Sequence, residues 1–189
     1  RAKDVYVYDD KGVEYLDLYG GHAVISIGHT HPHYVKRIRQ QLEQIAFYSN
    51  AIQNPLQKEL ANAIGEQSCL HDYSLFLCSS GAEAIENALK LASFHTARKK
   101  VIAFKGAFHG RTSAAVAVTD NPAINAPLNS QHEVVFLPFN DAEALERELA
   151  TESYCAVIFE SIQGVGGLDE PDEDFVYAME SLCNKYGSC

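Results

Sequence analysis

Short apolar runs alternate with longer helix-like stretches through the second half of the chain, and this rhythm constrains the fold more than any other feature. The runs are LFLC (75–78), VIAF (101–104), EVVFL (133–137) and CAVIFE (155–160). They lack the polar alternation of a half-exposed strand, so they suit strands that are buried on both faces. Such strands, separated by helices, predict an α/β fold with a mainly parallel sheet flanked by helices.

The stretches between and after these runs carry helix signals. An Ala-rich stretch follows Gly81. The stretch DAEALERELA has Asn140 as its expected N-cap, with Glu143 placed to reach back to it. A last helix, roughly Asp174 to Tyr186, should end at Gly187, because glycine readily adopts the left-handed conformation of a helix C-cap.

The first part of the chain has a different pattern. The segment VYVYDDKGVEYLDL (5–18) alternates around Asp-Asp-Lys-Gly, which predicts a β-hairpin. A helix should begin near Pro32, and a second amphipathic helix should lie between Pro55 and Gly65.

Composition limits the possible partners. The chain has 189 residues, and 15 basic against 25 acidic residues give a net charge of −10, which argues against a nucleic-acid or anionic-membrane partner. No apolar run is long enough to span a bilayer, and the N-terminus has no signal-peptide core. Five cysteines, an odd number without a C-x-x-C pair, indicate reduced thiols of a cytoplasmic protein rather than a disulfide or zinc framework.

A serine-glycine turn precedes the Ala-rich helix and raises the first question of function. The first backbone N–H groups of a helix have no partner within it, and the helix dipole adds positive charge there, so the turn can bind a phosphate or carboxylate. Alternatively, Ser79 or Ser80 only caps the helix and Gly81 relieves the turn. The stretch alone does not separate the two readings.

Unusual residues also follow two other strand-like runs, and in open α/β sheets ligands gather at the ends where strands finish. The loop KGAFHGRT supplies the ring of Phe108, the imidazole of His109 and the guanidinium of Arg111. Phe108 can stack on a planar cofactor or fill the core, and Arg111 can bind a carboxylate or form a surface ion pair. Glu160, before the loop SIQGVGG, can orient a neighbouring group or act as a structural carboxylate.

Several familiar site types are absent or weakly supported. The chain has no G-x-S-x-G nucleophile elbow and no Walker-type loop, and QGVGG does not fit the dinucleotide pattern. The stretch HTHPH places His29, His31 and His33 two residues apart, but no carboxylate or cysteine accompanies them. A metal site is therefore disfavoured.

Four motifs together resemble a known family. SSGAEAIENALKLA, VIAFKGAFHGRT, FNDAEALE and ESIQGVGG occur in the order and spacing of class III pyridoxal-phosphate (PLP) aminotransferases, and YLDLYGGHAVISIGHTHPHYV is similar to the N-terminal segment of that class. Within the class the chain looks most like the acetylornithine and succinylornithine aminotransferases. The resemblance covers nearly the whole chain.

The resemblance implies roles for particular residues. Those that would bind the cofactor, at its phosphate, its ring or the shell around it, are Ser80, Gly81, Ala82, Phe108 and Glu160. Arg111 would bind the α-carboxylate of the substrate, and His22 would reach the substrate from the N-terminal segment.

The resemblance also implies an organisation and a reaction. The fold would be the PLP-dependent transferase fold of type I, with residues 1–50 as an N-terminal segment and 51–189 as the first part of the large domain. The enzyme would be a cytoplasmic homodimer that moves the δ-amino group of N-acetyl- or N-succinyl-ornithine to 2-oxoglutarate, in arginine biosynthesis.

The chain departs from the family in two ways. The Schiff-base lysine and the Asp that pairs with the pyridine nitrogen are expected beyond Cys189, as is the next buried strand, so this portion alone should not catalyse transamination. Val165 stands where many relatives carry Glu. Another class III ω-aminotransferase (for ornithine or 4-aminobutyrate) or an aminomutase therefore stays open, as does a truncated, non-catalytic protein that binds a phosphate ligand or a partner.

Overall fold

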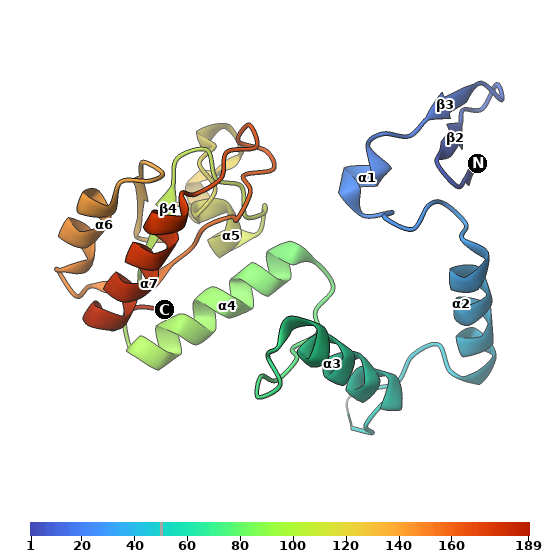
Figure 1. Ribbon diagram of the computed structural model, residues 1–189, viewed down its shortest axis with the longest axis horizontal. Coiled ribbons are helices and arrows are strands. Elements are labelled where there is room, and N and C mark those ends of the chain that lie inside the picture. Colours follow the sequence, from blue (N-terminus) through green and yellow to red (C-terminus); the bar gives the residue numbers. More distant parts are fainter. Residues whose placement is uncertain (50) are drawn as a thin grey trace. The chain divides into compact units, whose positions relative to one another are not determined.

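The computed structural model describes residues 1–49 and 51–189, which form two compact units, Arg1–Ser74 and Leu75–Cys189 (Figure 1). The predicted division of the chain falls at residue 50, which lies outside the described residues, so this division stays a prediction. Among the helices that the structure describes, none combines the length and apolar character needed to cross a membrane.

The first unit begins with a small antiparallel sheet. Its strands are β1 (Ala2–Lys3), β2 (Tyr6–Tyr8) and β3 (Glu14–Leu16), in that order. The predicted hairpin is confirmed, with Tyr6 opposite Leu16. A short left-handed turn, labelled α1 (Gly20–Ala23), follows the sheet.

Two longer helices complete this unit. Helix α2 (Pro32–Gln44) begins at the expected proline, and α3 (Pro55–Ser68) is capped by the Asn54 side chain. The prediction that α3 ends at Gly65 is wrong. Gly65 continues the helix, and the left-handed cap is Cys69 instead, with φ of 60°. Glycine permits a helix end but does not require one.

A parallel sheet forms the centre of the second unit. Its strands are β4 (Lys100–Phe104), β5 (Val134–Leu137) and β6 (Tyr154–Val157), in the order β5-β4-β6. Three of the four predicted strands and their parallel pairing are therefore confirmed. The backbone of Cys189 bonds to Cys155 and Val157 as a parallel neighbour of β6 would.

The first predicted strand, Leu75–Cys78, is wrong for the described chain. This segment joins neither sheet, and its side chains are exposed. A strand needs the backbone of a neighbouring strand to satisfy its N–H and C=O groups, and no described strand lies beside this segment. Apolar composition alone therefore did not identify the paired strands.

Helices follow the strands in the expected alternation. They are α4 (Gly81–Thr96), α5 (Ser113–Ala117), the 3₁₀ turns η1 (Pro122–Ile124) and η2 (Pro127–Asn129), α6 (Ala142–Leu149) and α7 (Glu173–Tyr186). Helix α7 ends at Gly187 as predicted, with φ of 67°. The predicted cap of α6 is wrong by one residue: the Asp141 side chain accepts the N–H of Ala144 at 2.9 Å, whereas Asn140 accepts that of Asp172.

Strand β4 lies between β5 and β6, and both of its faces are covered. Ile102 and Phe104 pack with α6 and α7, whereas Val101 and Ala103 pack with α4 and β6. Figure 1 shows these helices around the sheet. The loops that leave the ends of β4 and β6 therefore start from a rigid core.

Candidate functional site

The N-terminus of α4 carries the serine-glycine turn. The Ser80 hydroxyl accepts the N–H of Glu83 at 3.2 Å, and the Glu83 carboxylate accepts the N–H of Ser79 at 2.7 Å. Ser80 is therefore the N-cap, and Glu83 reaches back one residue beyond it, so the capping interpretation of Ser80 is confirmed. The N–H groups of Gly81 and Ala82 donate to no acceptor within the described parts of the chain. The helix end therefore keeps donors for an anion.

Three backbone N–H groups of the loop after β4 donate to side chains that hold the loop. The N–H of Gly106 donates to the Asp120 carboxylate, and that of His109 donates to the Thr119 hydroxyl, both at 2.9 Å. The N–H of Phe108 donates to Glu160 at 2.9 Å. These bonds fix the backbone on either side of the half-buried Phe108 ring.

Gly110 joins this loop to the start of α4. A Cβ atom at Gly110 would lie 2.7 Å from the Cβ of Ala82 and 3.1 Å from that of Ala115, and its φ is +134°. Only glycine tolerates both the approach and this conformation. The loop after β4 and the free amides of α4 are therefore neighbours.

The loop after β6 meets the same loop from the other side. The buried Gln163 side chain donates to the carbonyl of Lys105 at 2.9 Å, and a Cβ atom at Gly166 would lie 2.5 Å from the carbonyl oxygen of Gly106. Glu160 also accepts the N–H of Gly164 at 3.3 Å. Glu160 lies beyond β6 rather than closing it, and it bonds to both loops.

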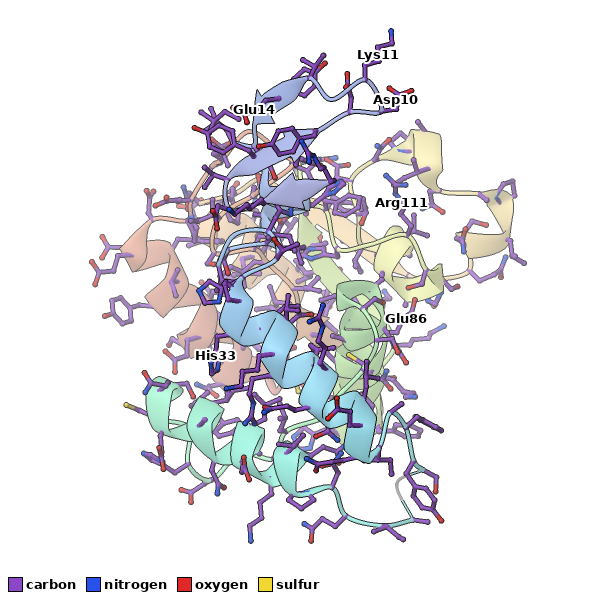
Figure 2. All side chains as sticks on the ribbon, turned by 90° about the vertical axis from the view of Figure 1, so that its right-hand side faces the viewer. Asp10, Lys11, Glu14, His33, Glu86 and Arg111 are labelled. Atoms are coloured by element: carbon purple, nitrogen blue, oxygen red, sulfur yellow. The ribbon has the colours of Figure 1, made fainter. Side chains whose placement is uncertain are left out.

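Arg111 lies exposed just before α5, and Glu86 on α4 anchors α5 (Figure 2). The Glu86 carboxylate accepts the N–H groups of Ala114 at 2.7 Å and Ala115 at 3.1 Å. Among residues 1–49 and 51–189, Arg111 forms no ion pair, so the surface salt bridge considered from sequence does not occur there. An unpaired guanidinium suits a carboxylate ligand.

Burial perturbs the ionisable groups of this region. Burial raises the pKa of Glu86, but hydrogen bonds from Thr112, Ala115 and Ala114 outweigh it, and the pKa is lower than usual. Burial lowers the pKa of His109, and the charge of Glu160 opposes that shift only in part. His109 is thus favoured as a neutral imidazole, and its buried Nε2 has no hydrogen-bond partner among the described residues.

The remaining candidates lie in the first unit. His22 lies on the left-handed turn, where its ring packs against that of Tyr19 at 4.8 Å between centroids. The three histidines of HTHPH do not form a metal cluster: no group of three metal-ligating side chains occurs in the described part of the chain, and His29 bonds to Asp17.

The structure thus brings together the predicted residues of the second unit and adds others. Gln163, Thr119 and Gly110 hold the loops but were not singled out from the sequence. Gln163 is a polar residue within a glycine-rich loop, and this position was the sequence signal that could have indicated its role. Nothing in the sequence indicated that Gly110 would meet Ala82, because that contact depends on how the chain folds in three dimensions.

Sequence comparison places these features in a wider context. Residues 1–189 match the family described as "Aminotransferase class-III". The chain is 43% identical to the acetylornithine aminotransferase of Archaeoglobus fulgidus over 99% of this chain and 49% of that protein. It is 42% identical to the acetylornithine aminotransferase of Bacillus cereus over 96% of this chain and 47% of that protein. The chain therefore spans about half the length of these relatives.

Comparison with solved structures also finds aminotransferases. The ornithine aminotransferase from Toxoplasma gondii ME49 superposes with a TM-score of 0.87 at 26% identity, covering 100% of this chain and 46% of that one. The taurine:2-oxoglutarate aminotransferase from Bifidobacterium kashiwanohense, determined in complex with PLP and glutamate, has a TM-score of 0.88 at 24% identity and covers 100% and 48%. The latter likeness concerns the fold alone.

Proposed function

Because the chain belongs to the class-III aminotransferase family, we propose that it is part of a PLP-dependent transaminase that moves the δ-amino group of an N-acylated ornithine to 2-oxoglutarate. Its fold is the PLP-dependent transferase fold of type I, as predicted. The observation that carries the proposal is the meeting of three segments, the start of α4 and the loops after β4 and β6, in a chain 43% identical to an acetylornithine aminotransferase.

The start of α4 fits the phosphate of the cofactor. The N–H groups of Gly81 and Ala82 have no acceptor among the described residues, and the Ser80 hydroxyl accepts one bond while keeping its own hydrogen to donate. α4 has 16 residues, so its dipole favours a dianion at this end. Ser80, Gly81 and Ala82 would hold the phosphate.

The two loops fit the ring of the cofactor. Phe108 would stack on it, and Glu160 would fix Phe108 through the backbone bond of 2.9 Å. PLP, when bound, supplies an electron sink for the carbon that loses its proton. The protein residues described here bind and orient; none of them needs to move that proton.

Arg111 would bind the carboxylate of the amino donor and then that of 2-oxoglutarate. Its guanidinium is exposed and unpaired in the described parts of the chain, and Glu86 anchors the adjacent helix. A bidentate pair of this kind also orients the ligand. We propose that His22 is a substrate contact and that the lysine and aspartate of the reaction lie in the part of the relatives that residues 1–189 do not match.

We further propose a cytoplasmic homodimer. All five cysteines are free, which supports a reducing compartment. Neither α2 nor α3 contains a buried residue, and Ile38, Leu42 and Ile45 stay at least 44% exposed. An apolar helix face of this kind supports burial against further protein in the intact enzyme. Light scattering of the intact protein measures its oligomeric state.

The activity is tested on the intact protein with PLP. N-acetylornithine, N-succinylornithine, ornithine and 4-aminobutyrate are each offered with 2-oxoglutarate, and glutamate formation is measured. We expect an N-acylated ornithine to give the highest kcat/KM. Arg111→Ala should raise the KM for both donor and 2-oxoglutarate, whereas Lys99→Ala, which removes an exposed ion pair with Glu133 away from the loops, should not.

Other outcomes separate the alternatives. Preference for ornithine or 4-aminobutyrate would assign the protein to another branch of the class, and glutamate formation from none of these donors would refute the transaminase proposal. An Arg111→Ala variant with unchanged KM for both carboxylate substrates would refute the role of that residue alone.

A further inference from the structure

A left-handed turn presents His22, and its conformation is unusual. Gly20, Gly21, His22 and Ala23 all have φ between 57° and 61°. Glycine adopts this region freely, but His22 and Ala23 carry Cβ atoms that disfavour it. Non-glycine residues persist in such conformations only where their surroundings fix them. Neighbouring groups must therefore hold this turn.

Asp17 supplies the first of these restraints. Its Oδ1 accepts the N–H of Gly20 at 2.8 Å and that of Tyr19 at 3.1 Å. Its own N–H donates to the carbonyl of Val5 at 2.8 Å. The side chain is only 11% exposed, and the bonds hold its pKa below the ordinary value, with His29 as the largest cause. An ionised carboxylate thus binds the first amides of the turn.

His29, which follows the turn in the sequence, supplies the second restraint. Its Nε2 lies 2.6 Å from Oδ2 of Asp17. Its backbone forms a two-bond bridge with Asp4, at 2.9 Å and 2.7 Å, and a Cβ atom at the preceding Gly28 would lie 3.3 Å from the carbonyl oxygen of Asp4. The sheet of the first unit therefore fixes His29, and His29 fixes Asp17.

Tyr19 connects this arrangement to His22. Its N–H is bound by Asp17, its carbonyl accepts the N–H of Ala23 at 3.0 Å, and its ring packs on the His22 imidazole with an interplanar angle of 56°. The chain of contacts runs from Asp4 through His29, Asp17 and Tyr19 to His22. Neither Asp17 nor His29 needs to touch a ligand to influence that imidazole.

We propose that Asp17 and His29 are positioning residues that hold the left-handed turn so that His22 meets the amino-donor substrate. This inference rests on the proposed function, because it takes His22 as a substrate contact. If the pair were purely structural, it would stabilise the small sheet and leave substrate affinity unchanged. A positioning role and a purely structural role therefore differ in their effect on substrate affinity.

The test uses the intact enzyme with PLP and three substitutions at two positions. Asp17→Asn keeps the shape and one acceptor but removes the charge, and His29→Ala removes the partner while His29→Gln can still donate to Asp17. We expect Asp17→Asn and His29→Ala to raise the KM for the amino donor at least about tenfold, because bonds to ionised groups are the stronger ones. kcat at saturation and PLP retention should change little, and His29→Gln should restore part of the affinity.

A second measurement does not depend on activity. Hydrogen exchange of the Tyr19 and Gly20 amides should accelerate at least about tenfold in both Asp17→Asn and His29→Ala, because a neutral amide oxygen accepts more weakly than a carboxylate and His29→Ala leaves the carboxylate without its partner. Tyr8→Phe is the matched control: it removes a 2.6 Å bond to Glu14 in the same sheet but does not touch the turn. It should change neither the exchange of these amides nor the KM.

The outcomes are distinct. Unchanged exchange in both Asp17→Asn and His29→Ala would show that neither the charge of the carboxylate nor its partner holds the turn, and the inference would fail. Faster exchange with a donor KM no higher than in Tyr8→Phe would mean that the pair holds the turn without positioning His22, which also overturns it. If the unsubstituted enzyme converted no donor, the proposed function would fail, and the exchange result would still test the restraint by itself.

Discussion

Gly110 offers the sharpest test of how the site is assembled. In Gly110→Ala the new methyl group would lie 2.7 Å from the Cβ of Ala82 and 3.1 Å from its Cα, far inside van der Waals contact. Overpacking of this kind costs about 1–3 kcal/mol. A φ of +134° adds backbone strain of about 1–3 kcal/mol for a residue with a Cβ atom. Gly110→Ala should therefore destabilise the protein by about 2–6 kcal/mol.

Two glycines of the loop after β6 provide matched controls. Gly167 has φ of +114° but open space around its Cβ position, so Gly167→Ala should show only the strain of about 1–3 kcal/mol. Gly164 has neither positive φ nor a neighbour within 4 Å, and Gly164→Ala should be neutral or stabilising by about 0.4–1 kcal/mol. Urea unfolding of the intact protein, with PLP absent and then present, measures all three.

The same glycine variants also test how the cofactor site is held together. If Gly110 holds its loop against the start of α4, the alanine methyl group pushes the two apart, and Gly110→Ala should release PLP more readily than Gly167→Ala does. Equal stability and equal PLP retention in Gly110→Ala and Gly167→Ala would contradict the role of Gly110, since its close approach to Ala82 would then have no energetic consequence.

Three further predictions concern individual residues of the site. Arg111→Ala should weaken binding of the amino donor and 2-oxoglutarate by about 10- to 150-fold, which corresponds to the loss of about 1.5–3 kcal/mol expected for a hydrogen bond to a charged group. PLP should stay bound. KM values measure the first effect, and absorbance spectra measure PLP binding. Ser80→Ala should destabilise the fold by about 0.5–2 kcal/mol through loss of the cap to Glu83, and it should also raise the Kd for PLP; unchanged PLP affinity would contradict the phosphate contact. Folding lowers the pKa of Glu86, so the ionised carboxylate stabilises the protein fully above the pKa of the unfolded state, and this stabilisation is lost as pH falls through the pKa of the folded state. Glu86→Gln should therefore flatten the pH dependence of the free energy of unfolding below about pH 4.5. A pH dependence equal to that of the unsubstituted protein would contradict this role of Glu86.

The sequence predicted the secondary structure well where local signals and burial agreed. Branched and aromatic runs became β4, β5 and β6, and a glycine ended α7. It failed where the outcome depended on a partner. Leu75–Cys78 has the composition of a buried strand but no neighbouring strand in the described chain. Asp141 caps α6 in place of Asn140, because the Asn140 side chain bonds to a distant residue, Asp172.

The site was predicted in part for the same reason. The free amides after Ser80 and the exposed guanidinium of Arg111 follow from a helix start and a loop, which are local features. The contacts that assemble the site are not local: Glu160 binds the N–H of Phe108, 52 residues away, and Gly110 meets Ala82. No pattern within one segment could indicate these contacts.

The most direct test of the central claim is a crystal structure of the intact protein with PLP. We expect the cofactor phosphate to lie within hydrogen-bond distance of the Gly81 and Ala82 amides and the Ser80 hydroxyl, with the Phe108 ring stacked on the pyridine. A phosphate bound elsewhere, with these amides facing solvent, would contradict the proposed cofactor site.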